Sequence, residues 1–126
     1  MIRAHRDAVK ALITGVAVFV STPGDAAPPY VVIHPDSGAA VPASYSGASS
    51  WRLWRFQTTA WGTTPEQAQW AAERAFACLL DAVPVVTGRS CAPIRHDVSL
   101  TVERDDDLPT PLWQARDVWA FSSVPA

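Results

Sequence analysis

Residues 54 to 76, WRFQTTAWGTTPEQAQWAAERAF, join a strand pattern to a helix pattern within a few positions. Alternate residues of the first part fall into an apolar and a polar set, namely Trp54, Phe56, Thr58 and Ala60 against Arg55, Gln57 and Thr59. Successive side chains of a strand point to opposite faces. We therefore expect a long strand over residues 51–61 whose apolar set lies in the core.

A helix start follows this strand directly. Gly62 ends the strand pattern, and the next residues supply an N-cap, a first-turn proline and the reciprocal partner of a capping box, at Thr64, Pro65 and Gln67. Apolar residues then recur at helical spacing: Ala68, Ala71, Ala72, Ala75, Phe76, Leu79, Leu80 and Val83. Because the first half of this stripe is alanine, the helix axis can lie close to the strand face that carries Trp54 and Phe56.

The flanking sequence predicts the remaining elements. A helix over residues 2–14 ends near Gly15, and a β-branched run follows at 16–20. Strand patterns occupy 30–34, 98–102 and about 114–122, and a Ser/Gly/Pro-rich loop occupies 35–50. We read the order as α-β-β-α-β-β. The prediction is an α+β two-layer sandwich, with a four-stranded, mainly antiparallel sheet and two helices on one face, and residues 1–126 forming one domain.

Charge and length limit the classes of partner. The chain has 126 residues, a net charge of −2 and 17% charged residues, fewer than the roughly 25% of an average soluble domain. A surface short of charge suggests that partner proteins cover part of it. The slightly acidic balance predicts no attraction to nucleic acid or acidic lipid, and no segment reaches the ~20 apolar residues of a membrane span.

No catalytic or metal-binding constellation is apparent. The serines at 44, 46, 49 and 50 lack a GxSxG setting, and His5, His34 and His96 are isolated from one another. The run Asp105 to Asp107 resembles a solvated loop more than a cation site. We therefore expect neither an enzyme nor a metal or other cofactor.

The N-terminus allows an alternative. A basic start, the apolar run ALITGVAVFV at 11–20 and small residues after it imitate a signal peptide, although Asp7 interrupts the basic start. A folded amphipathic helix is the favoured interpretation. A small secreted domain with a disulfide between Cys78 and Cys91 is the alternative, and otherwise both cysteines are reduced thiols.

One face of the expected sheet has no helix to cover it. Exposed aromatic residues on such a face are typical of an interface. We predict that Trp61, Trp113 and Trp119 anchor contacts between subunits, with membership of the chain's own core as the alternative for each.

Two segments carry a family resemblance: WRFQTTAWGTTPEQAQWAAERAFACLL and VSLTVERDDDLPTPLWQARDVWAF. Together they resemble the tail terminator family of long-tailed bacteriophages, mainly over residues 50–122. The resemblance implies a structural virion protein, assembled in the host cytoplasm, whose hexameric ring at the tail–head junction ends tail-tube polymerisation. It implies the tail-tube protein and a head-side connector or stopper protein as partners. Another neck or stopper protein is the runner-up.

Duplex DNA would pass through such a ring. A basic lining would bind the phosphates, whereas acidic side chains would let the duplex slide. We expect Glu103, Asp105, Asp106 and Asp107 to face the channel, with no sequence-specific contact to the DNA.

Overall fold

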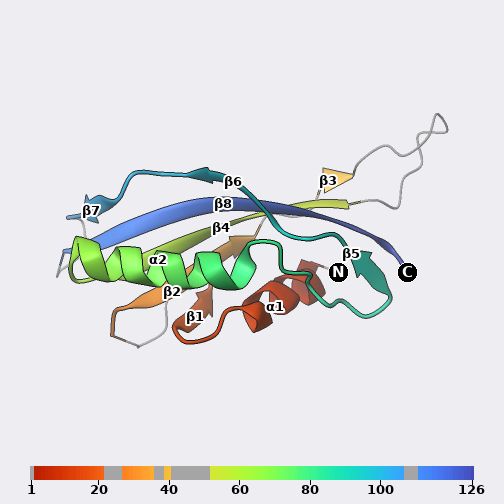
Figure 1. Ribbon diagram of the computed structural model, residues 1–126, viewed down its shortest axis with the longest axis horizontal. Coiled ribbons are helices and arrows are strands. Elements are labelled where there is room, and N and C mark those ends of the chain that lie inside the picture. The colour runs from red at the N-terminus through yellow and green to blue at the C-terminus, as the bar shows by residue number, and fades with distance from the viewer. Residues whose placement is uncertain (1, 22–26, 36–38, 41–51, 107–110) are drawn as a thin grey trace.

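The computed structural model describes residues 2–21, 27–35, 39–40, 52–106 and 111–126. Two helices, α1 (Ile2–Leu12) and α2 (Pro65–Leu79), lie on the same side of one sheet (Figure 1). The strands before α2 are β1 (Ala17–Val20), β2 (Tyr30–Pro35), β3 (Ala39–Ala40) and β4 (Arg52–Gly62). Those after it are β5 (Arg89–Cys91), β6 (Arg95–Ser99), β7 (Glu103–Asp105) and β8 (Leu112–Pro125).

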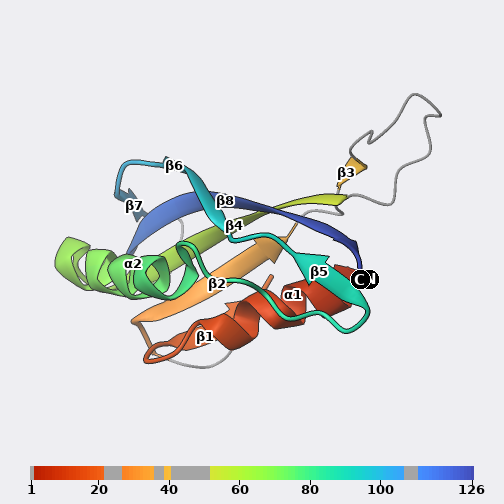
Figure 2. The ribbon, with the colours of Figure 1, turned by 45° about the vertical axis from the view of Figure 1, so that its right-hand side comes forward.

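The sheet is built around two long strands, β4 and β8. They pair antiparallel along the whole length of β4, from Arg52 opposite Ser123 to Gly62 opposite Trp113. The strand order is β1-β2-β4-β8-β5, while β3 pairs with β4, and β6 and β7 pair with β8. β1 runs parallel to β2, so the sheet is mixed. It curls into a half-barrel around the helices (Figures 1 and 2).

The prediction of a four-stranded, mainly antiparallel two-layer sandwich is therefore wrong. The described residues form eight strands. β8 extends over 14 residues, and its outer edge is paired in pieces by β5, β6 and β7, with a register shift between His96 and Val98. The single strand expected at 98–102 is thus two strands with a break between them. Long paired strands also twist and coil, which curls the sheet instead of leaving a flat layer.

The concave face of the sheet holds the core. Register places Trp54 opposite Phe121 and Phe56 opposite Trp119, and all four side chains are buried. Val9 and Ile13 bring α1 into the same cluster, as Ala71, Ala75 and Leu79 bring α2. The apolar set expected on β4, Trp54, Phe56, Thr58 and Ala60, is buried, but Thr59 of the opposite set is buried as well.

The corner between β4 and α2 forms as the sequence predicts, with one difference. Thr64 is the N-cap, and its hydroxyl accepts a hydrogen bond from the backbone N–H of Gln67 at 3.1 Å. The Gln67 side chain reaches one residue further back than in a capping box, and its Oε1 accepts from the Thr63 N–H at 2.7 Å. A Cβ on Gly62 would lie 2.4 Å from the backbone nitrogen of Ala68, so the close approach requires glycine.

Candidate interaction surfaces

Trp119 belongs to the chain's own core. Its side chain is 0% exposed, and its indole N–H donates to Thr58 Oγ1 at 3.0 Å. Phe56 and Phe76 pack on it with ring centroids 6.4 and 5.4 Å away. A side chain with no accessible surface cannot contact a neighbouring subunit in this conformation. The alternative of core membership therefore holds for Trp119.

Trp61 and Trp113 are half-buried but lie on opposite faces of the sheet. Trp61 alternates with the core residues of β4 and lies opposite Tyr30 and Gln114 on the convex face. Trp113 lies opposite Gly62, on the concave face beside the start of α2. A single interface patch on one face of the sheet cannot contain both indoles. Trp61 and Trp113 are therefore separate candidates for contacts with neighbouring subunits.

The acidic hairpin carries its own counter-charges. Glu103 accepts from Arg116 at 3.3 Å, and Asp106 pairs with Arg104 at 2.8 Å. Glu103 and Asp106 are exposed and Asp105 is half-buried, while Asp107 lies outside the described residues. Two of the expected channel-facing acids are thus held in surface ion pairs, which reduces the negative field they project.

The largest exposed apolar side chains lie elsewhere, at Trp70 (49% exposed), Phe76, Leu80, Val83, Val85, Val98 and Leu100. Sequence reasoning missed Trp70 as a surface residue, although its position off the alanine stripe of α2 was visible. It also assigned Phe76, Leu80 and Val83 to the buried stripe. Helix α2 ends at Leu79, and Leu80 is already extended, so the chain leaves helical geometry before Val83.

A groove lies between α2 and the segment that joins β6 to β7. Its apolar lining comes from Ala72, Phe76, Leu100, Val102 and Ala115, and its polar lining from Gln69, Glu73, Ser99, Arg116 and Asp117. The groove has two acids, Glu73 and Asp117, and one base, Arg116, in its lining. Its shape and composition suit a protein segment better than a small polar metabolite.

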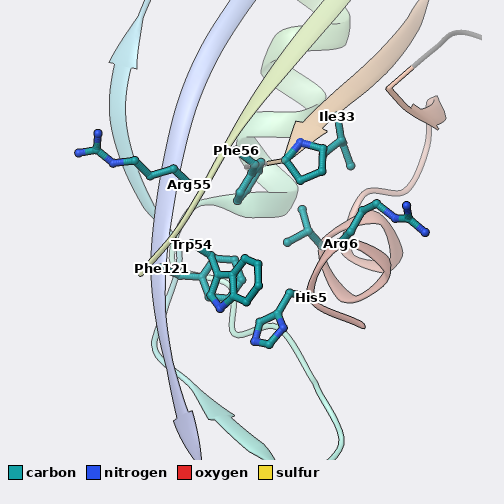
Figure 3. A pocket seen from close by; sticks show the side chains of 9 residues that line it. His5, Arg6, Ile33, Trp54, Arg55, Phe56 and Phe121 are labelled. Carbon is teal, nitrogen blue, oxygen red and sulfur yellow. The ribbon is translucent and has the colours of Figure 1, made fainter. Parts of the chain in front are cut away.

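A second, smaller pocket lies where α1 meets the sheet (Figure 3). The His5 ring stacks on Trp54 with centroids 4.1 Å apart, and Phe121 lies behind them. His5 Nε2 hydrogen-bonds with Ser123 Oγ at 2.8 Å, and Arg89 Nε donates to the same hydroxyl at 2.9 Å. These contacts fix α1 on the end of the sheet. The N-terminal residues from Ile2 to Leu12 are thus a helix that packs into the core, as the favoured interpretation expects.

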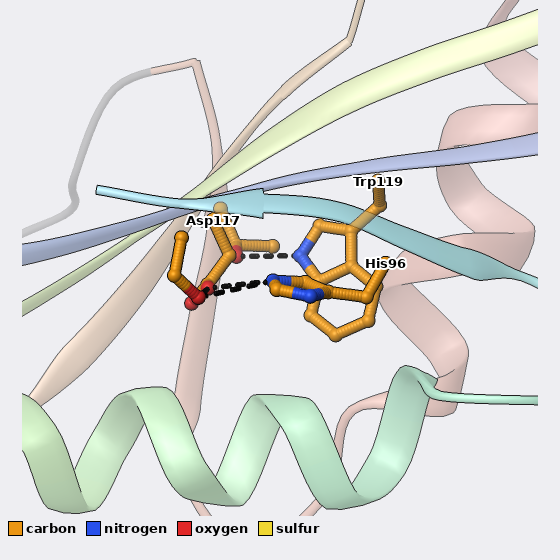
Figure 4. Close-up of polar contacts among 5 residues, drawn as sticks. His96, Asp117 and Trp119 are labelled. Carbon is orange, nitrogen blue, oxygen red and sulfur yellow. Dashed lines mark hydrogen bonds and ion pairs between the residues drawn. The ribbon is translucent and has the colours of Figure 1, made fainter.

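A histidine, a serine and an aspartate meet beside the groove (Figure 4). His96 Nε2 lies 2.9 Å from Asp117 Oδ1 and 3.1 Å from Ser99 Oγ, and Ser99 also donates to Asp117. In a catalytic triad the acid and the nucleophile bind opposite ring nitrogens of the histidine. Here both contact the same nitrogen, and Ser99 also bonds to the aspartate directly, so the cluster lacks the serine–histidine–aspartate order of a triad. It satisfies the buried Asp117 carboxylate instead.

The cysteines are not bridged. Cys78 and Cys91 are both free thiols, so the disulfide of the secreted alternative does not form in this structure. Among the described residues, no group of three or more His, Cys, Asp or Glu side chains could hold a metal ion. No described helix has the length and apolar character needed to cross a membrane.

Comparison with known proteins gives a likeness of fold. No protein-family profile and no curated protein matches the sequence. Among solved structures, the fold is similar to that of a chain in "Virion of native gene transfer agent (GTA) particle", with a TM-score of 0.63 and 19% sequence identity. The match covers 92% of this chain and 84% of that one. The chain therefore shares the fold of a protein found in a virion.

Proposed function

We propose that this chain is a structural virion protein, a tail terminator whose copies form a ring at the junction of tail and head. The observation that carries the proposal is the likeness of fold to a chain of a gene transfer agent virion over 92% of the sequence. The resemblance of residues 50–122 to tail terminators gives the more specific role, in which a hexameric ring caps the tail tube and meets the head-side connector.

The surface composition supports an assembly role. Among the described residues, seven large apolar side chains, from Trp70 on α2 to Leu100 beyond β6, are at least 36% exposed in the single chain. Single exposed apolar residues are normal, but here Phe76 and Leu100 both line one groove. Partner subunits would remove these groups from water. In this account, Trp61 and Trp113 are further contact residues, on the two faces of the sheet.

The acidic hairpin belongs to the same proposal. We place Glu103, Asp105, Asp106 and Asp107 toward the channel through which duplex DNA passes. The ion pairs to Arg104 and Arg116 offset two of the four acids, and the mildly acidic lining that remains neither binds phosphates nor strongly repels them. Reversing the three aspartates to lysine should slow DNA delivery without changing tail assembly. Delivery at the wild-type rate would contradict the placement.

Deletion of the gene from the genome that encodes it tests the role. A terminator limits polymerisation of the tail tube, so its loss should give tails of uncontrolled length that do not join heads. A stopper or other neck protein acts after the tail is complete, so its loss should give tails of normal length beside unjoined heads. Electron microscopy of the lysate distinguishes the two phenotypes. Normal particles in the deletion strain would contradict both roles.

A further inference from the structure

Two helix faces that point away from the core carry opposite charges at the same spacing. On α2, the core side is formed by Ala68, Ala71, Ala75 and Leu79, and the outward side presents Glu66, Trp70 and Glu73. These three residues follow one another at i, i+4 and i+7, so they share one stripe of the helix. All three are exposed, and neither glutamate has an ion pair within the described residues.

The outward side of α1 is the positive counterpart. His5, Val9 and Ile13 face the core, while Arg3 and Lys10 are exposed seven positions apart, without an ion pair in the described chain. Asp7 lies between them on the same stripe, but its carboxylate accepts from Arg6 Nε at 3.3 Å. The face therefore keeps a net positive charge.

The two spacings match. Seven residues of helix correspond to about 10.5 Å along the axis, both between Glu66 and Glu73 and between Arg3 and Lys10. Two helices laid side by side can thus form two ion pairs at once, two turns apart. Trp70 would lie between the pairs, opposite Asp7 and the Arg6 guanidinium paired with it, where that guanidinium or the methylene stem of Lys10 can cover its ring.

The two faces do not meet within one chain. α1 and α2 are fixed beside each other, because Arg74 Nε donates to the Thr14 carbonyl at 2.8 Å, yet both charged stripes are exposed. Both helices lie on one side of the sheet, as Figures 1 and 2 show. Among the described residues neither stripe is engaged by the other, and a second copy carries the complement of each.

We propose that copies of this chain associate through these stripes, with Glu66, Trp70 and Glu73 of one copy on Arg3 and Lys10 of the next. The inference rests on the proposed ring and names the surfaces that would join neighbouring subunits. A contact between two different surfaces is heterologous, and repetition of a heterologous contact closes a ring when its rotation allows. The ion pairs would set register and orientation, and the indole would supply buried apolar area.

Charge reversal tests the contact by sedimentation velocity of the purified chain at low salt, up to roughly 1 mM protein. The double variants Arg3→Glu/Lys10→Glu and Glu66→Lys/Glu73→Lys should each weaken association at least about tenfold, because like charges then face each other. Trp70→Ala should also weaken it. An equimolar mixture of the two double variants should associate again, since every contact in an alternating assembly is once more between opposite charges.

Two controls separate a lost contact from lost folding or altered net charge. Glu66 lies in the first turn of α2, where an acid favours the helix, so Glu73→Lys alone is the milder test, and far-UV circular dichroism checks that each variant is folded. Arg95→Glu changes net charge as Lys10→Glu does, but on an exposed position of β6, and should associate like the wild type.

Three results would overturn the inference: folded double variants that associate like the wild type, a mixture no better than its components, or a wild-type chain that stays monomeric throughout. The deletion phenotype is independent of these measurements. The deletion strain could give tails of uncontrolled length while the charge variants associate like the wild type. That combination would support the terminator role and show that the subunits contact each other through another surface.

Discussion

At the scale of single residues, the core contains a buried hydrogen bond between β4 and β8. The Trp119 indole N–H is buried and donates to Thr58 Oγ1. Thr58→Val keeps the shape of the side chain but removes the acceptor, so it should lower the free energy of unfolding by about 1–3 kcal/mol. Thr59→Val is the matched control, because Thr59 is also buried but its hydroxyl accepts only a 3.3 Å bond from Gln57. Equal losses in urea denaturation would contradict this account of Trp119.

Tyr30 gives a prediction for alkaline pH. Burial raises the pKa of Tyr30 above its usual value near 10, because the phenolate loses solvation on the sheet. The neutral Tyr30 side chain makes its full contribution to stability below the unfolded pKa of about 10. That contribution is lost as the pH rises through the higher pKa of the folded state. The free energy of unfolding of the wild type minus that of Tyr30→Phe, measured by urea denaturation, should therefore be constant from neutral pH to about pH 9 and then fall. A difference independent of pH would contradict the burial of the phenol.

At the scale of elements, the corner between β4 and α2 is the most constrained point of the fold. Gly62→Ala would place a methyl group 2.4 Å from the Ala68 backbone nitrogen, and backbone cannot move aside as a flexible side chain can. We expect a loss of about 2–3 kcal/mol in the free energy of unfolding. Gly88→Ala is the control, with open space around its Cβ but a φ of +79°, and should cost about 1 kcal/mol. Equal losses for the two variants would mean that the corner is not tightly packed.

The corner between β4 and α2 could be predicted from the sequence. Its signals are local, because Thr64 and Gln67 cap the helix within a few residues and alternation fixes which side chains of β4 face the core. The edges of the sheet are set by distant partners instead. β8 is longer than any one strand on its outer edge, and the register shift between His96 and Val98 depends on pairing that no local pattern specifies. The parallel pairing of β1 and β2 is invisible to the sequence for the same reason.

The surface residues also differ in whether a local sequence pattern or a distant partner determines their position. Trp119 alternates with Val118, but only the register with Phe56 on β4 shows that its face is the core. The position of Trp70 off the alanine stripe of α2 is a local signal, and it is sufficient to predict that this side chain is exposed. The Arg116 partner of Glu103 could not be predicted, because it comes from another strand of the hairpin, whereas Arg104 lies only two residues from its partner Asp106.

At the scale of the whole molecule, the curled sheet and its two helices present the surfaces on which the proposed assembly depends. The similar virion chain keeps the fold with 19% of residues identical, so the residues that contact partners can differ between the two. In this chain, exposed apolar groups and the charged stripes of α1 and α2 are the distinctive surface features. Exposed ion pairs are screened by salt. Association should therefore weaken as ionic strength rises, whereas an assembly held by the groove alone should not.

The most direct test of the central claim is the position of this chain in the intact particle. Purified virions labelled with a gold-conjugated antibody against the chain can be imaged by electron microscopy, with particles from the deletion strain as the control. A terminator ring should carry gold at the junction of tail and head and nowhere else. Virions that carry no label, or that carry it along the tail or on the capsid, would contradict it.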